Sequence, residues 1–215
     1  IKINTILNQA LKWRPKLTSL RRKLHQYPEI TPNLMHTKKI LENYLKQSAW
    51  KNVKTKDKNT LCFDLRGRKK GPTILLCAAM DGSPHKENAN HHYSSTIAGQ
   101  CHLQAHDAQM SCLANTMIYL SQFQKEFQGT IRAVFLSGEN DYSGARRFIE
   151  EKLLENVDLA ISLDFDPSAE TGKIFYQYGV SKPRVDQINI ECLGMTSQSS
   201  RYAVNPVHSA AELIT

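Results

Sequence analysis

Apolar residues recur at helical spacing in two segments near the start of the chain. Residues 4–25 and 34–48 carry them three and four positions apart, which predicts two amphipathic helices. The stretch "YPEITPN" at 27–33 separates them, and its two prolines are expected to end one helix and begin the next. A third helix is predicted over 107–124, with Asp107 suited to cap it, and a fourth over 143–155.

Four other segments are predicted to be strands: 59–67, 72–80, 130–137 and 157–165. The last three are apolar nearly throughout, as is typical of strands covered on both faces. Alternating strands and helices of this kind predict an α/β sandwich around a largely parallel sheet.

The pattern changes after residue 173, where shorter apolar segments and the helical "NPVHSAAELIT" follow. We therefore predict a first α/β domain over 1–180 and the beginning of a second domain over 181–215. The chain stops inside its last predicted helix, so we expect this second domain to continue beyond Thr215.

Composition and charge bear on three questions: whether the protein binds a membrane, whether it binds nucleic acid, and in which compartment it lies. Hydrophobic residues make up 40% of the chain, and no apolar run approaches the roughly 20 residues that span a bilayer, so no membrane partner is predicted. The net charge is +8, with Lys and Arg concentrated in residues 12–70, but no aromatic residues alternate with them. We interpret these charges as solvated surface and predict no nucleic-acid partner. Five cysteines without a C-x-x-C pair favour a reducing compartment, so we predict a cytoplasmic protein.

Histidines and carboxylates gather at the ends of the predicted strands. The carboxyl ends of parallel strands meet at one edge of a sheet, which is where α/β proteins bind ligands. Taken singly, each side chain has a simpler interpretation, such as a loop hydrogen bond or a helix cap. Together they favour a metal-dependent hydrolytic centre, in which ligands fix an ion and a carboxylate deprotonates its water. The candidates are Asp81, His102, His106, Asp107, Glu139, Asp164 and Asp166.

Four motifs resemble one known family, the aminoacylase and hippurate-hydrolase group of metal-dependent amidohydrolases. "LRRKLHQYPEI" is similar to its Leu-Arg-Arg-x-Leu-His-x-x-Pro-Glu, and "AAMDGSP" to Ala-Asp-Met-Asp-Ala-Leu-Pro. "GQCHLQAHDAQ" is similar to Gly-x-Met-His-Ala-Cys-Gly-His-Asp-Gly-His, and "FLSGENDYSGARRFI" to Phe-Gln-Pro-Ala-Glu-Glu followed by Gly-Ala-Arg. The resemblance implies a three-layer α/β/α sandwich of the zinc-exopeptidase type. It also implies the start of a smaller α+β lid or dimerisation domain.

The resemblance also implies site residues. It makes Glu139 the general base and Asp81 a second catalytic residue. The family's metal ligands fall on Gln104, His106, Asn140 and Asp164. Its substrate-binding histidine falls on Gln198, and we group His102 with it. The last metal ligand of the family has no counterpart within residues 1–215.

Several of these positions carry different chemistry from the family pattern. Amides stand at Gln104 and Asn140 in place of a thiolate and a carboxylate, and amide oxygens are weak ligands for zinc. By resemblance the cofactor is zinc or manganese, and we expect one weakly bound ion or none. We predict a relative of hydrolases of N-acyl amino acids or small peptides with impaired or lost di-metal catalysis. The alternative is a non-catalytic homologue whose cleft binds a small molecule or a protein, so whether the chain is an enzyme stays open. A homodimer is an expectation from the resemblance.

Overall fold

The computed structural model divides into two compact units, Ile1–Pro167 and Ser168–Thr215. It describes residues 3–46, 48–140, 142–176, 179, 188–196 and 203–214. The helices of the first unit are α1 (Ile3–Gln26), α2 (Met35–Leu45), α3 (His106–Ser121) and α4 (Ser143–Glu150). Its strands are β1 (Lys51–Val53), β2 (Leu61–Arg66), β3 (Thr73–Ala79), β4 (Thr130–Leu136) and β5 (Leu159–Ser162). The second unit contains α5 (Pro206–Ile214).

The five strands form one mixed sheet in the order β1-β2-β4-β3-β5. β3 pairs in parallel with β4 and β5, whereas β2 pairs antiparallel with β1 and β4. The prediction of a largely parallel sheet therefore holds only for β4, β3 and β5. The segments predicted at 59–67 and 72–80 are consecutive in the chain, but β4 lies between them and pairs with both.

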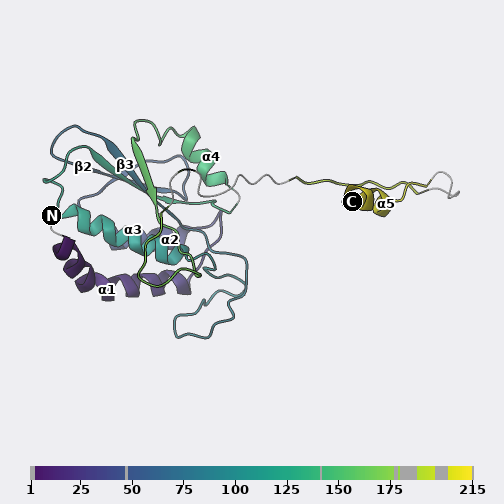
Figure 1. Cartoon of the computed structure of the whole chain (residues 1–215), viewed down its shortest axis with the longest axis horizontal. Helices are drawn as coiled ribbons and strands as arrows, with labels where there is room; N and C mark the ends of the chain where they lie inside the picture. The colour runs from purple at the N-terminus through teal and green to yellow at the C-terminus, as the bar shows by residue number, and fades with distance from the viewer. Residues whose placement is uncertain are drawn as a thin grey trace. The chain divides into compact units, whose positions relative to one another are not determined.

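Helices cover both faces of this sheet. One core joins α1, α2 and α3 to residues of β2 and β4 that point to the same side, including Leu65, Ala133 and Phe135. The alternate residues Cys62 and Val134 point to the other side and pack with Phe148 of α4. In Figure 1, α1 and α3 lie on one side of the sheet and α4 on the other. The first unit thus has three layers, helix–sheet–helix.

The edge strand β5 departs from the expected burial. Its apolar pattern predicts a buried strand, yet all four of its residues are exposed. Leu159 is 53% exposed and Ile161 48% exposed, because in the described residues only β3 pairs with this strand. The prediction of burial for 157–165 is wrong for this structure.

None of the described helices combines the length and the apolar character that a membrane crossing requires. The longest, α1, carries polar and basic residues along its whole length. In the second unit an isolated bridge pairs Met195 with Val204, and α5 follows it. The two-domain assignment with its boundary at residue 180 stays a prediction.

Candidate functional site

Two acidic residues meet where β3 and β4 end. These strands run parallel with Ala79 beside Leu136, so the residues that follow them emerge together. The backbone N–H of Glu139 donates to Oδ2 of Asp81 at 2.9 Å. The hydroxyl of Thr31 donates to Oδ1 of Asp81. Asp81 is 1% exposed, so both of its carboxylate oxygens are occupied inside the protein and its orientation is fixed.

His106, the first residue of α3, joins this pair. Its Nδ1 lies 2.7 Å from the backbone oxygen of Asp81. A carbonyl can only accept, so Nδ1 carries the hydrogen and, in the neutral ring, Nε2 presents its lone pair. Nε2 lies 3.8 Å from Oε2 of Glu139. Histidines that bind metals hold their second nitrogen in this way, so His106 is oriented as a ligand would be. The structure brings together Asp81, His106 and Glu139.

The other predicted metal positions surround this group less closely. Gln104 is exposed, and the chain turns after it at Ala105, whose φ is 56°. Asn140 is exposed, and its Nδ2 donates to the backbone oxygen of Gly82 at 3.3 Å. Asp164 is exposed and accepts from Nε2 of Gln109 at 3.4 Å. Gln198 lies outside the described residues.

His102 is buried, with 6% of its surface exposed, and neither ring nitrogen has a hydrogen-bond partner. Burial lowers the pKa of His102 to about 4, so the ring is neutral at physiological pH. Its ring centre lies 6.3 Å from that of His25. The substrate-binding role assigned to His102 stays a prediction.

Asp107 does not cap α3 as expected. The cap position is Ala105, and the fully buried Asp107 reaches α1 instead. Its Oδ2 accepts from Nε of Arg21 at 3.0 Å and lies 2.8 Å from Nδ1 of His25. Burial alone would raise the pKa of Asp107, but the hydrogen bond with His25 and the nearby positive charges lower it. Two α1 side chains therefore hold the first turn of α3 in place.

The contact with Asp107 also changes the pKa of His25. The hydrogen bond with Asp107 raises the pKa of His25, and a second bond to Glu87 adds to this against the effect of burial. Nε2 of His25 lies 3.2 Å from Oε1 of Glu87, whose other oxygen accepts from the backbone N–H of Ser95 at 2.7 Å. This ionic group ties α1 both to the loop after β3 and to α3.

Sequence reasoning assigned no role to Thr31, Arg21, His25 or Glu87. Arg21 and His25 did carry a signal, because a basic residue and a histidine four positions apart lie on one helix face. Thr31 and Glu87 lie in loops, where nothing in the sequence shows which distant group they meet.

The donors near His106 can be tested against a metal centre. Among the residues that the structure describes, no three His, Cys, Asp or Glu side chains are placed to hold one ion. Glu139 is the carboxylate paired with His106, and Gln104 and Asn140 offer only amides. The carboxylate of Asp164 accepts from Gln109. This set does not fit a two-metal centre, which needs more anionic ligands.

Comparison with known proteins gives a family match and several relatives. The model of the peptidase family M20/M25/M40 matches residues 75–214. N-acetyl-L-cysteine deacetylase of Bacillus subtilis is 28% identical over 201 residues, which are 93% of this chain and 48% of that protein. N-acyl-L-amino acid amidohydrolase of Geobacillus stearothermophilus is 24% identical over 198 residues, 91% of this chain and 54% of that protein. The chain thus spans about half the length of these relatives.

Solved structures agree on the fold. The YXEP protein of Bacillus subtilis, described as a dinuclear metal binding peptidase, is 26% identical with a TM-score of 0.70. The match covers 73% of this chain and 44% of that protein. A putative aminohydrolase from methicillin-resistant Staphylococcus aureus is 24% identical with a TM-score of 0.76, covering 81% and 47%. The predicted α/β sandwich and the resemblance to the amidohydrolase group are confirmed.

Proposed function

The chain belongs to peptidase family M20/M25/M40, and from this premise we propose that its cleft takes N-acyl amino acids or small peptides while two-metal hydrolysis is impaired or lost. The proposed substrate class follows the printed names of two relatives, an N-acetyl-L-cysteine deacetylase and an N-acyl-L-amino acid amidohydrolase. The proposed impairment follows from the donors around His106.

One observation carries the proposal. The free nitrogen of His106 faces Glu139 at 3.8 Å, whereas the amide of Asn140 donates a hydrogen bond to Gly82. An amide N–H that donates to the backbone cannot neutralise a dication. Gln104 likewise brings no charge. Two closely spaced dications would repel each other strongly without anionic donors between them.

The remaining acid–base pair can still move protons. Glu139 has a side chain that is 45% exposed, and its backbone is held by Asp81. A water beside it could lose a proton to the carboxylate as its oxygen attacks the amide carbon. The carboxylate would then pass the proton to the amine as the C–N bond breaks. In this proposal Glu139 is the general base, and Asp81 fixes the position of the loop that carries it.

The test measures metal content and hydrolysis in the same samples. The full protein is dialysed against zinc or manganese, analysed by elemental mass spectrometry, and assayed on N-acetyl amino acids. We expect less than one tightly held ion per chain and little hydrolysis. The combined variant Gln104→Cys, Asn140→Glu and Asp164→His restores the family donors and should raise metal affinity by about tenfold or more.

Gln128→Cys is the matched control, since it adds a thiol at an exposed loop position away from the site. It should leave metal content unchanged. Two tightly held ions in the unaltered protein, with hydrolysis abolished by Glu139→Gln, would contradict the proposal. No gain of metal in the combined variant would show that these residues do not form the site.

A second candidate is a non-catalytic binding protein that uses the same cleft. Two large apolar side chains stand out on the loops that carry the site: Leu103 is 67% exposed and Tyr142 69% exposed. Contiguous apolar patches mark binding surfaces, and these two side chains are the proposed contacts of this candidate. Calorimetric titration with N-acyl amino acids in the presence of a metal chelator distinguishes the two. Binding that persists without metal and weakens in Leu103→Ala supports this candidate.

Further proposals follow from the family and from the composition of the chain. We propose zinc or manganese as the ion, the cytoplasm as the location, and a homodimer formed through a second domain that begins near residue 181. The proposed partner is a small acyl-amino acid or peptide, with no nucleic acid and no membrane.

A further inference from the structure

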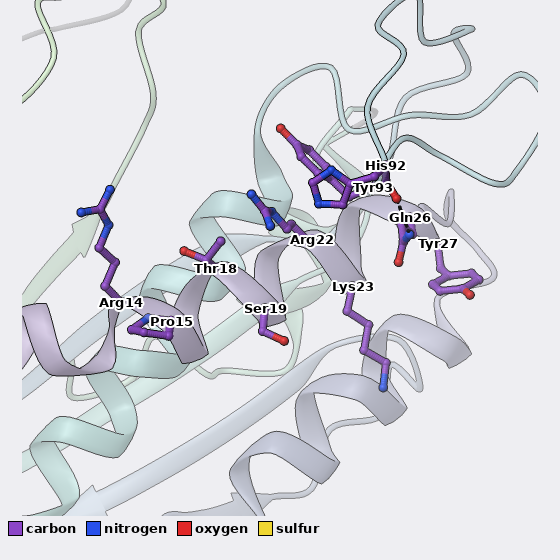
Figure 2. Close-up of a pocket in the computed structure, with 10 residues that line it drawn as sticks. All are labelled: Arg14, Pro15, Thr18, Ser19, Arg22, Lys23, Gln26, Tyr27, His92 and Tyr93. Atoms are coloured by element: carbon purple, nitrogen blue, oxygen red, sulfur yellow. Dashed lines mark hydrogen bonds between the residues drawn. The ribbon is translucent and has the colours of Figure 1, made fainter.

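A basic groove runs along the outer face of α1, separate from the cluster of Asp81, His106 and Glu139. It has a volume of about 750 Å³ and is lined by α1, the residue that follows it, and the loop that carries His92 and Tyr93. Figure 2 shows its side chains projecting from the helix on either side, with His92 and Tyr93 beside Arg22. Its volume lies within the range of small-molecule sites.

The helix repeat explains why the basic groups gather here. Arg14, Thr18 and Arg22 are four residues apart and form one row, while Ser19 and Lys23 form the next. Each row therefore places a hydroxyl next to a cation. At a rise of about 1.5 Å per residue, Arg14 and Arg22 are about 12 Å apart along the helix axis. An elongated ligand with several negative groups matches this spacing.

Among the residues that the structure describes, Arg14, Arg22 and Lys23 have no acidic partner in an ion pair. The lining of the groove contains no Asp or Glu. The nearby carboxylates are already occupied, since Asp107 binds Arg21 and Glu87 binds His25. Arg14 and Arg22 lie on one row of the helix without a counter-charge in the lining, and uncompensated positive charges attract anions from solution.

The groove is also organised in advance. Nε2 of Gln26 donates to the backbone oxygen of His92 at 3.3 Å, and the backbone N–H of Thr96 donates to the oxygen of Gln26 at 2.9 Å. The guanidinium of Arg22 lies over the ring of Tyr93, 4.9 Å from its centre. These contacts hold the loop against the end of α1, so a ligand would meet walls that are already positioned.

We infer that the groove along α1 binds a small multivalent oxyanion of the oligophosphate or phosphorylated-metabolite class along the row of Arg14, Thr18 and Arg22. Guanidinium groups bind phosphate oxygens with two parallel hydrogen bonds, and the neighbouring hydroxyls add donors. A small ligand is favoured over a nucleic-acid strand because the lining is confined to one helix, the residue after it and one loop.

The test is calorimetric titration of the full protein with inorganic tripolyphosphate in about 0.1 M salt, where screening acts over about 10 Å. We expect saturable binding that Arg14→Gln weakens by about tenfold, since each variant removes one charge-assisted contact. Arg22→Gln, which removes the other cation of the same row, should act similarly. Lys12→Gln is the matched control, because Lys12 is an exposed cation on the same helix outside the lining, and it should leave the affinity within twofold.

Three results would overturn the inference. The first is an absence of saturable tripolyphosphate binding at this salt concentration. Lys12→Gln could weaken binding as much as Arg14→Gln, which would show diffuse attraction by the whole basic surface. Alternatively, single-stranded or duplex DNA of equal phosphate concentration could bind more tightly than tripolyphosphate, which would reassign the groove to nucleic acid. Circular dichroism of each variant verifies that α1 is intact, so a loss of binding is assigned to the groove.

Discussion

Replacing His25 tests how the first turn of α3 is held. Its imidazole is buried and bridges Asp107 at 2.8 Å and Glu87 at 3.2 Å. His25→Ala removes both contacts, and the fully buried Asp107 keeps its ion pair with Arg21. In His25→Asn the shorter side chain cannot reach Glu87. Its amide N–H₂ can still donate to Asp107 in place of Nδ1 of the imidazole. The two variants therefore separate the contributions of the two bonds.

The expected loss of unfolding free energy follows from the burial and the charge of the groups that His25 contacts. A hydrogen bond between ionised partners contributes about 1.5–3 kcal/mol when buried. The contact with Glu87, whose side chain is 16% exposed, adds about 0.5–1 kcal/mol. With the packing of the ring, His25→Ala should lower the free energy of unfolding by about 3–4 kcal/mol. His25→Asn should lower it by about half as much.

The assay is urea unfolding followed by circular dichroism at pH 6. His85→Ala is the control, because His85 is an exposed histidine of the loop after β3 and its replacement should change stability by less than about 0.5 kcal/mol.

The pKa of His25 is raised in the folded state, so its stabilising charge is fully present below the unfolded value of 6.5. That contribution is lost as pH rises through the folded pKa. The gap between the unaltered protein and His25→Asn should therefore shrink between pH 6 and pH 8.5. Equal losses in His25→Ala and His85→Ala, or a gap that widens with pH, would refute this account.

Further predictions concern groups outside the site. Burial alone would raise the pKa of Asp57, but hydrogen bonds from its neighbours and the charge of Arg147 lower it, so Asp57 stabilises the fold above the unfolded pKa of 3.8. That contribution is lost as pH falls through the folded pKa, so acid titration of Asp57→Asn should show a smaller loss of stability between pH 5 and pH 3 than the unaltered protein. Burial raises the pKa of Cys62 to about 12 and that of Cys77 to about 11. Both thiols should resist iodoacetamide at pH 8 in the folded protein and react in urea, as mass spectrometry would show. Phe135→Ala empties the centre of the larger core and should lower the free energy of unfolding by about 3–5 kcal/mol in urea titration.

Much of the fold could be predicted from hydrophobic periodicity. The helix expected over 4–25 is α1 (Ile3–Gln26), and the strand expected over 130–137 is β4. β1 was missed because its three residues, Lys51–Val53, carry no alternation that a pattern could reveal. The order of the strands could not be predicted from the sequence either, since β2 and β3 are consecutive in the chain but β4 lies between them in the sheet. Pairing depends on which faces the helices cover, and local periodicity does not report that.

Some features of the site could likewise be predicted from the sequence, and others could not. The placement of Asp81 and Glu139 at the ends of parallel strands was predictable, because topology alone brings such ends together. The function of Asp107 was not, since an aspartate before a helix reads equally well as a cap. Only the packing of α1 on α3 shows that it meets Arg21 and His25 instead. Contacts between groups more than 80 positions apart leave no local signal in the sequence.

Hydrogen bonds within the protein hold the framework of the site. Asp81 is central to these bonds, because its two carboxylate oxygens accept from Thr31 and from the backbone of Glu139, while its backbone oxygen receives His106. One buried residue thereby joins the loop after α1, the ends of β3 and β4, and the start of α3. Loss of anionic ligands at Gln104 or Asn140 would leave these bonds in place. A chain with this arrangement can lose the chemistry of its family and still keep a shaped cleft, which is why metal content and ligand binding have to be measured separately.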